Sequence, residues 1–246
     1  MFEGLKEALQ YVNRLKEESM QPIVTEIAGK TYCNKDLVRY GREDLAKAIH
    51  VNTLSAMVDY ITGKREELRE KMILHIVSPK EVSLYSGLLE ERNRETLFVC
   101  DAIVNEFQFD KYYDQERFLI ELQANFAEND DLRTIMQVAG NIQAGTTASY
   151  SDDGISQKTT IKTGVQRVDV QVPNPVKLIP YRTFAEIEQP SSLYVFRVKD
   201  DGNGAPMFKL VEADNGLWKH AAMLKIKDYF ECELADAYKE NLTIIA

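Results

Sequence analysis

Cysteine, histidine and long apolar runs are all scarce in this sequence of 246 residues. The three cysteines (Cys33, Cys100 and Cys232) are odd in number and far apart, which excludes a disulfide framework and a zinc knuckle. We expect each of them to be a small buried hydrophobic side chain. The apolar runs are only a few residues long, and the N-terminus is charged and amphipathic. We therefore expect no signal peptide, no membrane span and a cytoplasmic protein.

Motifs of the common enzyme classes are missing as well. The sequence has no glycine-rich phosphate loop, no His-Glu-x-x-His helix, no Cys-x-x-Cys pair and no Gly-x-Ser-x-Gly turn. His50, His75 and His220 are scattered among elements of different kinds. The Asp-Asp-Gly run at 152–154 is typical of a turn, because the later glutamate of a calcium loop is absent. The sequence thus predicts a non-enzymatic protein with no catalytic residue, metal or cofactor, although an enzyme with a less regular site stays open.

Length and composition predict a folded protein with a sizeable core. The hydrophobic fraction is 44%, and 22 residues are Phe or Tyr (10 and 12), which argues against disorder. The formal net charge of −9 argues against a non-specific nucleic-acid binder, although a local basic groove is compatible with it. We expect an N-terminal helical and hairpin region at 1–70 and an α+β core domain at 71–246, or one continuous domain.

The β-rich stretch at 150–189 organises the predicted fold. Ile, Thr and Val occupy odd-numbered positions from 155 to 165 and alternate with polar residues. The valines at 168, 170 and 172 occupy even-numbered positions. Alternation is typical of strands with one buried face, and the change of parity requires a turn or bulge, which Gly164 allows. We predict an α+β fold, a mainly antiparallel sheet with long central strands at about 155–172, packed by several amphipathic helices.

Periodic patterns on both sides of this stretch predict the remaining elements. The expected helices are at 2–15 and 54–63, from 114, from 130 and around 226–237. The expected strands are at 23–25 and 31–33 as a hairpin, then 73–77, 82–84, 96–99, 107–109, 193–198, 208–211 and 242–245. The strand at 193–198 has apolar residues on both faces and should be central, and the Asp-Asp-Gly-Asn-Gly run after it predicts a hairpin turn.

One cluster of cationic and aromatic residues is a candidate binding face. Its members are Lys177, Tyr181, Arg182, Phe184, Arg197 and Lys199, with Tyr194 and Phe196 between them. Cations interleaved with aromatic rings can hold single-stranded nucleic acid or nucleotides by stacking and phosphate contact. The alternative is a sheet edge on which Lys and Arg stems lie over aromatic rings. The acidic balance of the chain favours this structural interpretation.

Three segments resemble a known family. They are Ser-Pro-Lys-Glu-Val-Ser-Leu-Tyr at 78–85, Asp-Asp-Gly-Ile-Ser-Gln at 152–157, and the central block from Pro-Asn-Pro-Val at 173–176 through Pro-Tyr-Arg-Thr-Phe at 180–184 to Glu-Gln-Pro at 188–190. The order and the residues are similar to the YfdQ-type proteins of phages and prophages, a domain of unknown function, over about 50–245. The resemblance implies a phage or prophage origin and expression in the host cytoplasm. It supplies no catalytic residues.

Two functional hypotheses from different classes follow. In the first, the chain is a non-enzymatic phage accessory protein that binds a host or phage macromolecule and modulates replication, recombination or defence. We expect it to form a homo-oligomer, because a sheet-rich protein with unprotected strand edges often hides them in a symmetric contact. In the second, the basic-aromatic face binds single-stranded DNA or a small nucleotide, as a recombination accessory or a nucleotide sponge.

Overall fold

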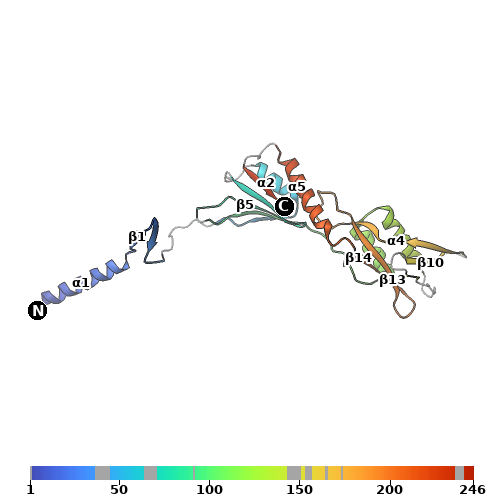
Figure 1. The fold of residues 1–246 in the computed structure, drawn as a ribbon, viewed down its shortest axis with the longest axis horizontal. Coiled ribbons are helices and arrows are strands. Elements are labelled where there is room, and N and C mark those ends of the chain that lie inside the picture. Colours follow the sequence, from blue (N-terminus) through green and yellow to red (C-terminus); the bar gives the residue numbers. More distant parts are fainter. Residues whose placement is uncertain are drawn as a thin grey trace. The chain divides into compact units, whose positions relative to one another are not determined.

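A computed structural model describes residues 2–36, 45–63, 71–90, 92–142, 151–152, 157–163, 166–172, 174–235 and 241–246 (Figure 1). The chain divides into two compact units, Met1–Leu45 and Ala46–Ala246. The boundary between these units lies at 45/46, whereas the sequence predicts either a division at 70/71 or one continuous domain. The reason is that the strand and helix at 49–63 pack into the larger unit.

The first unit consists of one helix and one hairpin. Helix α1 (Phe2–Met20) is followed by the antiparallel strands β1 (Val24–Ile27) and β2 (Lys30–Cys33), as the sequence predicts. The two turn residues between the strands both have positive φ, 52° at Ala28 and 73° at Gly29, which matches the twist of a hairpin. The side chain of Asn34 accepts a hydrogen bond from the Ile23 N–H at 2.7 Å and closes the open end of the hairpin.

The first sheet of the larger unit has a meander at its centre. Strands β4 (Met72–Ser78), β5 (Glu81–Ser86) and β6 (Thr96–Asp101) pair antiparallel, and the parallel strands β3 (Ile49–Val51) and β15 (Leu242–Ile245) flank them. Helices α2 (Leu54–Gly63) and α5 (Leu217–Glu233) lie against this sheet (Figure 1). Alternate residues of β4 are buried beneath these helices, which is the pattern of a sheet with one solvated face.

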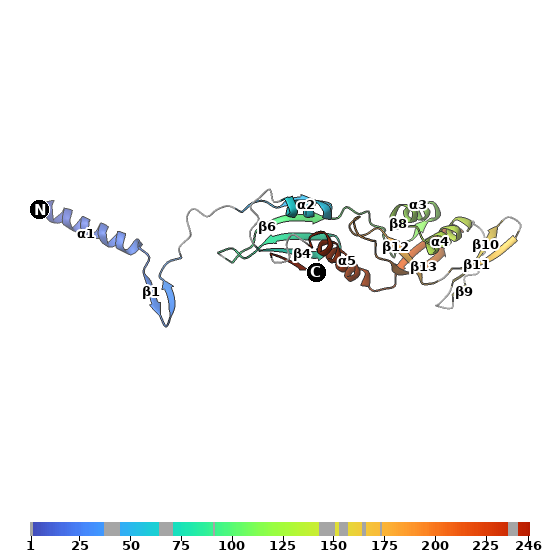
Figure 2. The same ribbon diagram turned by 90° about the horizontal axis from the view of Figure 1, so that it is seen from above.

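The second sheet is fully antiparallel. Its order is β7 (Tyr113–Asp114), β14 (Pro206–Glu212), β13 (Ser192–Asp200), β12 (Val176–Pro180) and β8 (Phe126–Ala127). Helices α3 (Gln115–Asn125) and α4 (Asp130–Asn141) cover one face, where an aromatic core surrounds Phe118 (Figure 2). Strand β13 is central, as predicted. Only one of its faces is buried, however, because Leu193 on the other face is 42% exposed.

A third, smaller sheet holds the two strands that the sequence predicts at about 155–172. Strands β10 (Gln157–Thr163) and β11 (Gln166–Val172) pair antiparallel along their whole length, as predicted, and the two residues of β9 (Ser151–Asp152) pair with β10. Among the described residues this pair is separate from the two five-stranded sheets, so it is not central. The predicted turn at Gly164 lies outside the described residues, and so do residues 153–154 of the turn predicted at 152–154, whereas Asp152 belongs to β9.

The fold class is thus α+β with mainly antiparallel sheets. The strand expected at 107–109 is absent in the described structure. Phe107 instead packs its ring against Phe126 and Tyr113, with centroids 5.1 and 5.2 Å apart, and fills the aromatic core from a connecting segment.

The start of α3 gives a first prediction. The Asp114 side chain accepts a hydrogen bond from the Arg117 N–H at 2.8 Å and caps the helix. Replacing Asp114 with Ala should lower the free energy of unfolding by about 1 kcal/mol, because an N-terminal N–H loses its acceptor. Glu116→Ala removes a carboxylate from the same first turn without removing the cap, so urea unfolding should show a loss of only a few tenths of a kcal/mol. Equal losses in the two variants would contradict a capping role.

Candidate nucleic-acid interface

Three of the six predicted binding residues share the outer face of the second sheet. In β12 and β13 the even-numbered residues Val176, Leu178, Tyr194, Phe196 and Val198 are buried in the aromatic core beneath α3 and α4. Successive side chains of a strand point to opposite faces, so the odd-numbered residues face away from the helices. Lys177 on β12, together with Arg197 and Lys199 on β13, therefore lies on the outer face of this sheet.

The other three predicted residues do not belong to this face. Arg182 is only 7% exposed, and Phe184 is buried in the core of the first sheet with α2 and α5. Tyr181 is 47% exposed but follows the end of β12. The physical reason is that the chain leaves the second sheet after Pro180, so the strand alternation no longer applies. The predicted grouping is wrong for Arg182 and Phe184.

Two residues that the sequence analysis missed complete the outer face. Lys209 on β14 lies directly across the strand pair from Arg197. The ammonium groups of Lys199 and Lys209 lie 3.9 and 5.0 Å from the ring centroid of Tyr112, within cation–π range. We call the five residues Lys177, Arg197, Lys199, Lys209 and Tyr112 the cationic face.

The position of Lys209 could have been derived from the sequence. The turn at 200–204 and the returning strand were both predicted, and the observed register of that hairpin places Arg197 opposite Lys209. A register deduced from the turn would therefore have added Lys209. No comparable signal marks Tyr112, because it comes from the connecting segment before β7.

The cationic face is weakly neutralised. Among the described residues, the carboxylate that pairs with one of its cations is Asp110, 2.6 Å from the Lys209 Nζ. This hydrogen bond raises the pKa of the Lys209 amine, and the adjacent Arg197 guanidinium opposes the rise. Arg197 itself donates only to the backbone carbonyl of Phe196 in the described structure, at 3.3 Å. The cluster therefore carries a surplus of positive charge.

Apolar side chains separate Lys177 from the other cations. Lys177 lies opposite Leu193, and Val195 lies opposite Val211 on the same outer face. The four-residue step from Leu193 to Arg197 spans about 13 Å of strand. Cations at both ends, with an apolar and aromatic surface between them, can contact phosphates and the faces of unpaired bases at the same time.

Arg182 has a structural role instead. Its guanidinium donates to the Tyr194 hydroxyl at 2.9 Å, the Glu212 carboxylate at 3.1 Å and the Pro190 carbonyl at 3.2 Å, and it also contacts the Ser192 hydroxyl.

The Trp218 ring stacks on the same guanidinium, with its centroid 3.9 Å from Cζ. Burial lowers the pKa of Arg182 and raises the pKa of the Tyr194 hydroxyl, because both groups are removed from water. The Arg182 Nε is buried and has no hydrogen-bond partner in the described part of the chain. Arg182 thus links the first residues of β13 to α5 and is not available to a phosphate on the outer face.

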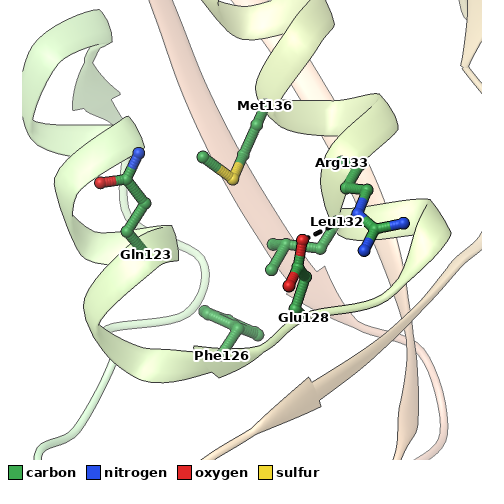
Figure 3. Close-up of a pocket in the computed structure, with 6 residues that line it drawn as sticks. All are labelled: Gln123, Phe126, Glu128, Leu132, Arg133 and Met136. Atoms are coloured by element: carbon green, nitrogen blue, oxygen red, sulfur yellow. Dashed lines mark hydrogen bonds and ion pairs between the residues drawn. The ribbon is translucent and has the colours of Figure 1, made fainter.

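A cavity of about 420 Å³ lies between α3 and α4, on the helical side of the same sheet. Figure 3 shows Phe126, Leu132 and Met136 lining it, with Gln123 beside them. Its charged residues Glu128 and Arg133 pair with each other at 2.8 Å. The lining is therefore mainly apolar, and the one carboxylate among these residues is paired with the one guanidinium.

The groups that usually build enzyme sites are dispersed in the described structure. No three His, Cys, Asp or Glu side chains gather as metal ligands among the described residues. The expectation of three buried cysteines is wrong for Cys33 and Cys232, which are exposed, and holds for Cys100. No helix in the described ranges has the length and apolar character needed to cross a bilayer.

Comparisons of this chain with family models, with curated proteins and with solved structures found no match.

Proposed function

We propose that this chain is a non-catalytic protein that binds single-stranded nucleic acid on its cationic face. The observation that carries the proposal is the cross-strand pair of Arg197 and Lys209, with Lys199 and Tyr112 beside it and, within the described ranges, Asp110 as the one carboxylate paired with these cations. Arg197 and Lys209 repel each other, and Asp110 neutralises only one of the two charges, so the pair favours an anionic ligand. A phosphate backbone is such a ligand, and Tyr112, Leu193 and Val195 offer apolar surface to its bases.

The acidic balance of the whole chain sets the expected strength of binding. With a formal net charge of −9, the protein repels nucleic acid at long range, so only the local field of the cationic face attracts it. Binding should therefore be weak at physiological salt and steeply salt-dependent. Single strands fit better than duplexes, because stacking on Tyr112 needs an unpaired base.

Fluorescence polarisation with a short labelled single strand, measured over a salt series, tests this proposal. Three to four phosphate contacts predict a slope of about −2 to −3 for log K against log salt. The double variant Arg197→Ala/Lys199→Ala should bind the strand more than about tenfold more weakly at low salt. It should also make the slope shallower by about 1.4, because binding with two fewer phosphate contacts releases fewer counterions.

The matched control is Lys225→Ala/Lys227→Ala on α5, which removes the same charge from residues that pair with Glu188 and Glu231. Its affinity should stay within about twofold of the wild-type value, since these lysines lie outside the cationic face. Equal losses in both double variants would mean that only net charge matters, and no binding at about 50 mM salt would reject the proposal.

A small nucleotide is the second candidate ligand, because one phosphate and one base match the Lys199–Tyr112 contact at 3.9 Å. Competition distinguishes the two ligands. If a free nucleotide displaces the labelled strand at a concentration similar to the Kd of the nucleotide for the protein, one nucleotide is sufficient to occupy the binding site. If only longer strands compete, several phosphate contacts are needed.

The biological setting of this binding is also a proposal. The resemblance to YfdQ-type proteins supports an accessory protein of a phage or prophage that acts in the host cytoplasm. Within that setting, a protein that holds single strands without cutting them suits replication, recombination or defence.

A further inference from the structure

The first unit exposes an unusually large share of its apolar side chains. Leu5, Leu9 and Val12 on α1 are 58–60% exposed, and Leu15 is 45% exposed. Their spacing of three and four residues places them along one face of the helix. The hairpin adds further exposed side chains, Val24, Ile27 and Tyr32. All strand residues of β1 and β2 are exposed.

Such a unit lacks the contacts that stabilise helices and hairpins in water. Most helical stability in proteins comes from packing of the apolar face, and an isolated helix of about this length is marginal. A two-stranded hairpin alone is equally marginal. A continuous apolar stripe on an otherwise charged helix therefore requires a covering surface.

The sequence of α1 indicates what this surface is, because the apolar stripe within residues 2–15 is symmetric about the midpoint of that segment. Reflection about the midpoint between residues 8 and 9 exchanges Phe2 with Leu15, Leu5 with Val12, and Ala8 with Leu9. A two-fold interface requires a surface that complements itself in this way. Two α1 helices in opposite directions would place apolar residues against apolar residues along about 20 Å.

The charges of α1 select the same orientation. Lys16 follows Val12 by four residues and Leu9 by seven, so it lies within the apolar stripe. A parallel, in-register pair would bring the two Lys16 ammonium groups together in the seam. The antiparallel pair instead separates the two Lys16 side chains to opposite ends of the seam.

We propose that α1 is a self-association element that pairs antiparallel with α1 of a second copy of this chain. This surface is separate from the cationic face and does not depend on its function. Each copy would supply Leu5, Leu9, Val12 and Leu15 to the seam, and the opposite, charged face of the helix would remain in water.

Sedimentation velocity of the full chain under reducing conditions tests the association. Wild type should show a concentration-dependent monomer–dimer equilibrium. Leu9→Glu should raise the dissociation constant at least about 100-fold, because it places a carboxylate from each copy in the apolar seam. Gln10→Glu adds the same charge on the other face of α1 and should leave the constant within about twofold. Leu9→Ala, which keeps helix propensity, should give an intermediate weakening.

The orientation has its own measurement. A spin label at Ser19→Cys, in a chain with Cys33→Ser and Cys232→Ser, reports the distance between the two helix ends, since Cys100 is buried. The antiparallel pair predicts a distance of about 30 Å between the labelled backbones, whereas a parallel pair predicts about 10 Å. A wild-type chain that stays monomeric, an oligomer that Leu9→Glu does not weaken, or the short distance would each overturn the proposal.

Discussion

Replacing Arg182 with methionine is expected to lower the free energy of unfolding by about 3 kcal/mol, a loss of more than a hundredfold in the folding equilibrium. The change removes the donors that satisfy Tyr194, Ser192 and Glu212, and it ends the stacking on Trp218. Glu212 then keeps a negative charge without its partner. Because the Glu212 side chain is 30% exposed, water partly compensates that charge, which puts the loss at the lower end of the range for buried pairs.

Urea unfolding of three variants isolates the cause. Arg133→Met removes an exposed arginine from a surface ion pair and should cost less than about 1 kcal/mol. The double variant Arg182→Met/Glu212→Leu should recover part of the loss, because it removes the unpaired carboxylate with the guanidinium. A loss in Arg182→Met no larger than that in Arg133→Met would show that the Arg182 contacts do not stabilise the fold.

Native-state alkylation of Cys100 is expected to be about three orders of magnitude slower than that of an ordinary thiol at pH 8. Burial, with the nearby carboxylates of Glu186 and Asp101, raises the pKa of the Cys100 thiol to about 12. The reactive thiolate is therefore nearly absent at pH 8, whereas a thiol with a pKa of about 8.5 is substantially ionised. Iodoacetamide labelling followed by peptide mass analysis should modify Cys33 and Cys232 first, since both are exposed.

The single-cysteine variant Cys33→Ser/Cys232→Ser provides the control for this labelling. Its remaining thiol should react at the ordinary rate in concentrated urea and only slowly in buffer. Rapid labelling of Cys100 in buffer would contradict the buried position that the packing of β6 gives it.

The same shift makes stability depend on pH. The pKa of Cys100 is higher in the folded state than in the unfolded state, so unfolding releases a proton when the pH lies between about 8.5 and 12. The contribution of Cys100 is complete below about pH 8.5 and is lost as the pH rises through this window. Comparison of wild type with Cys100→Ala over the alkaline range isolates this contribution from that of the tyrosines, and parallel curves would contradict it.

Local patterns predicted the elements of this fold because their causes are local. Short apolar runs identified β4 and β5, alternation identified β13, and the acidic residue at 114 identified the start of α3. The place of β10 and β11 was not predictable in this way, since pairing partners depend on residues far apart in sequence. The same limit explains Phe107, whose apolar neighbours come from α3, β7 and β8.

The residues of the candidate site also differ in how far local sequence determines their positions. Lys177, Arg197 and Lys199 share one side of the sheet because strand alternation fixes that side, and their role in binding stays a prediction. Arg182 was misplaced because its burial depends on Trp218 and Glu212, which follow it by 36 and 30 residues in the chain. Composition identifies a cation, but only the partners from other elements determine whether water or protein surrounds it.

The short segment at 181–190 has a consequence for how this protein can change over generations. Arg182 serves the second sheet, Phe184 and Ile187 fill the core of the first, and Thr183 contacts the Pro79 carbonyl in the turn between β4 and β5. Gln189 further ties the segment to itself through the Arg182 N–H and the Phe184 carbonyl. A substitution in this loop must be compatible with the packing of both sheets at once. The loop should therefore accumulate substitutions more slowly during evolution than the strands it joins.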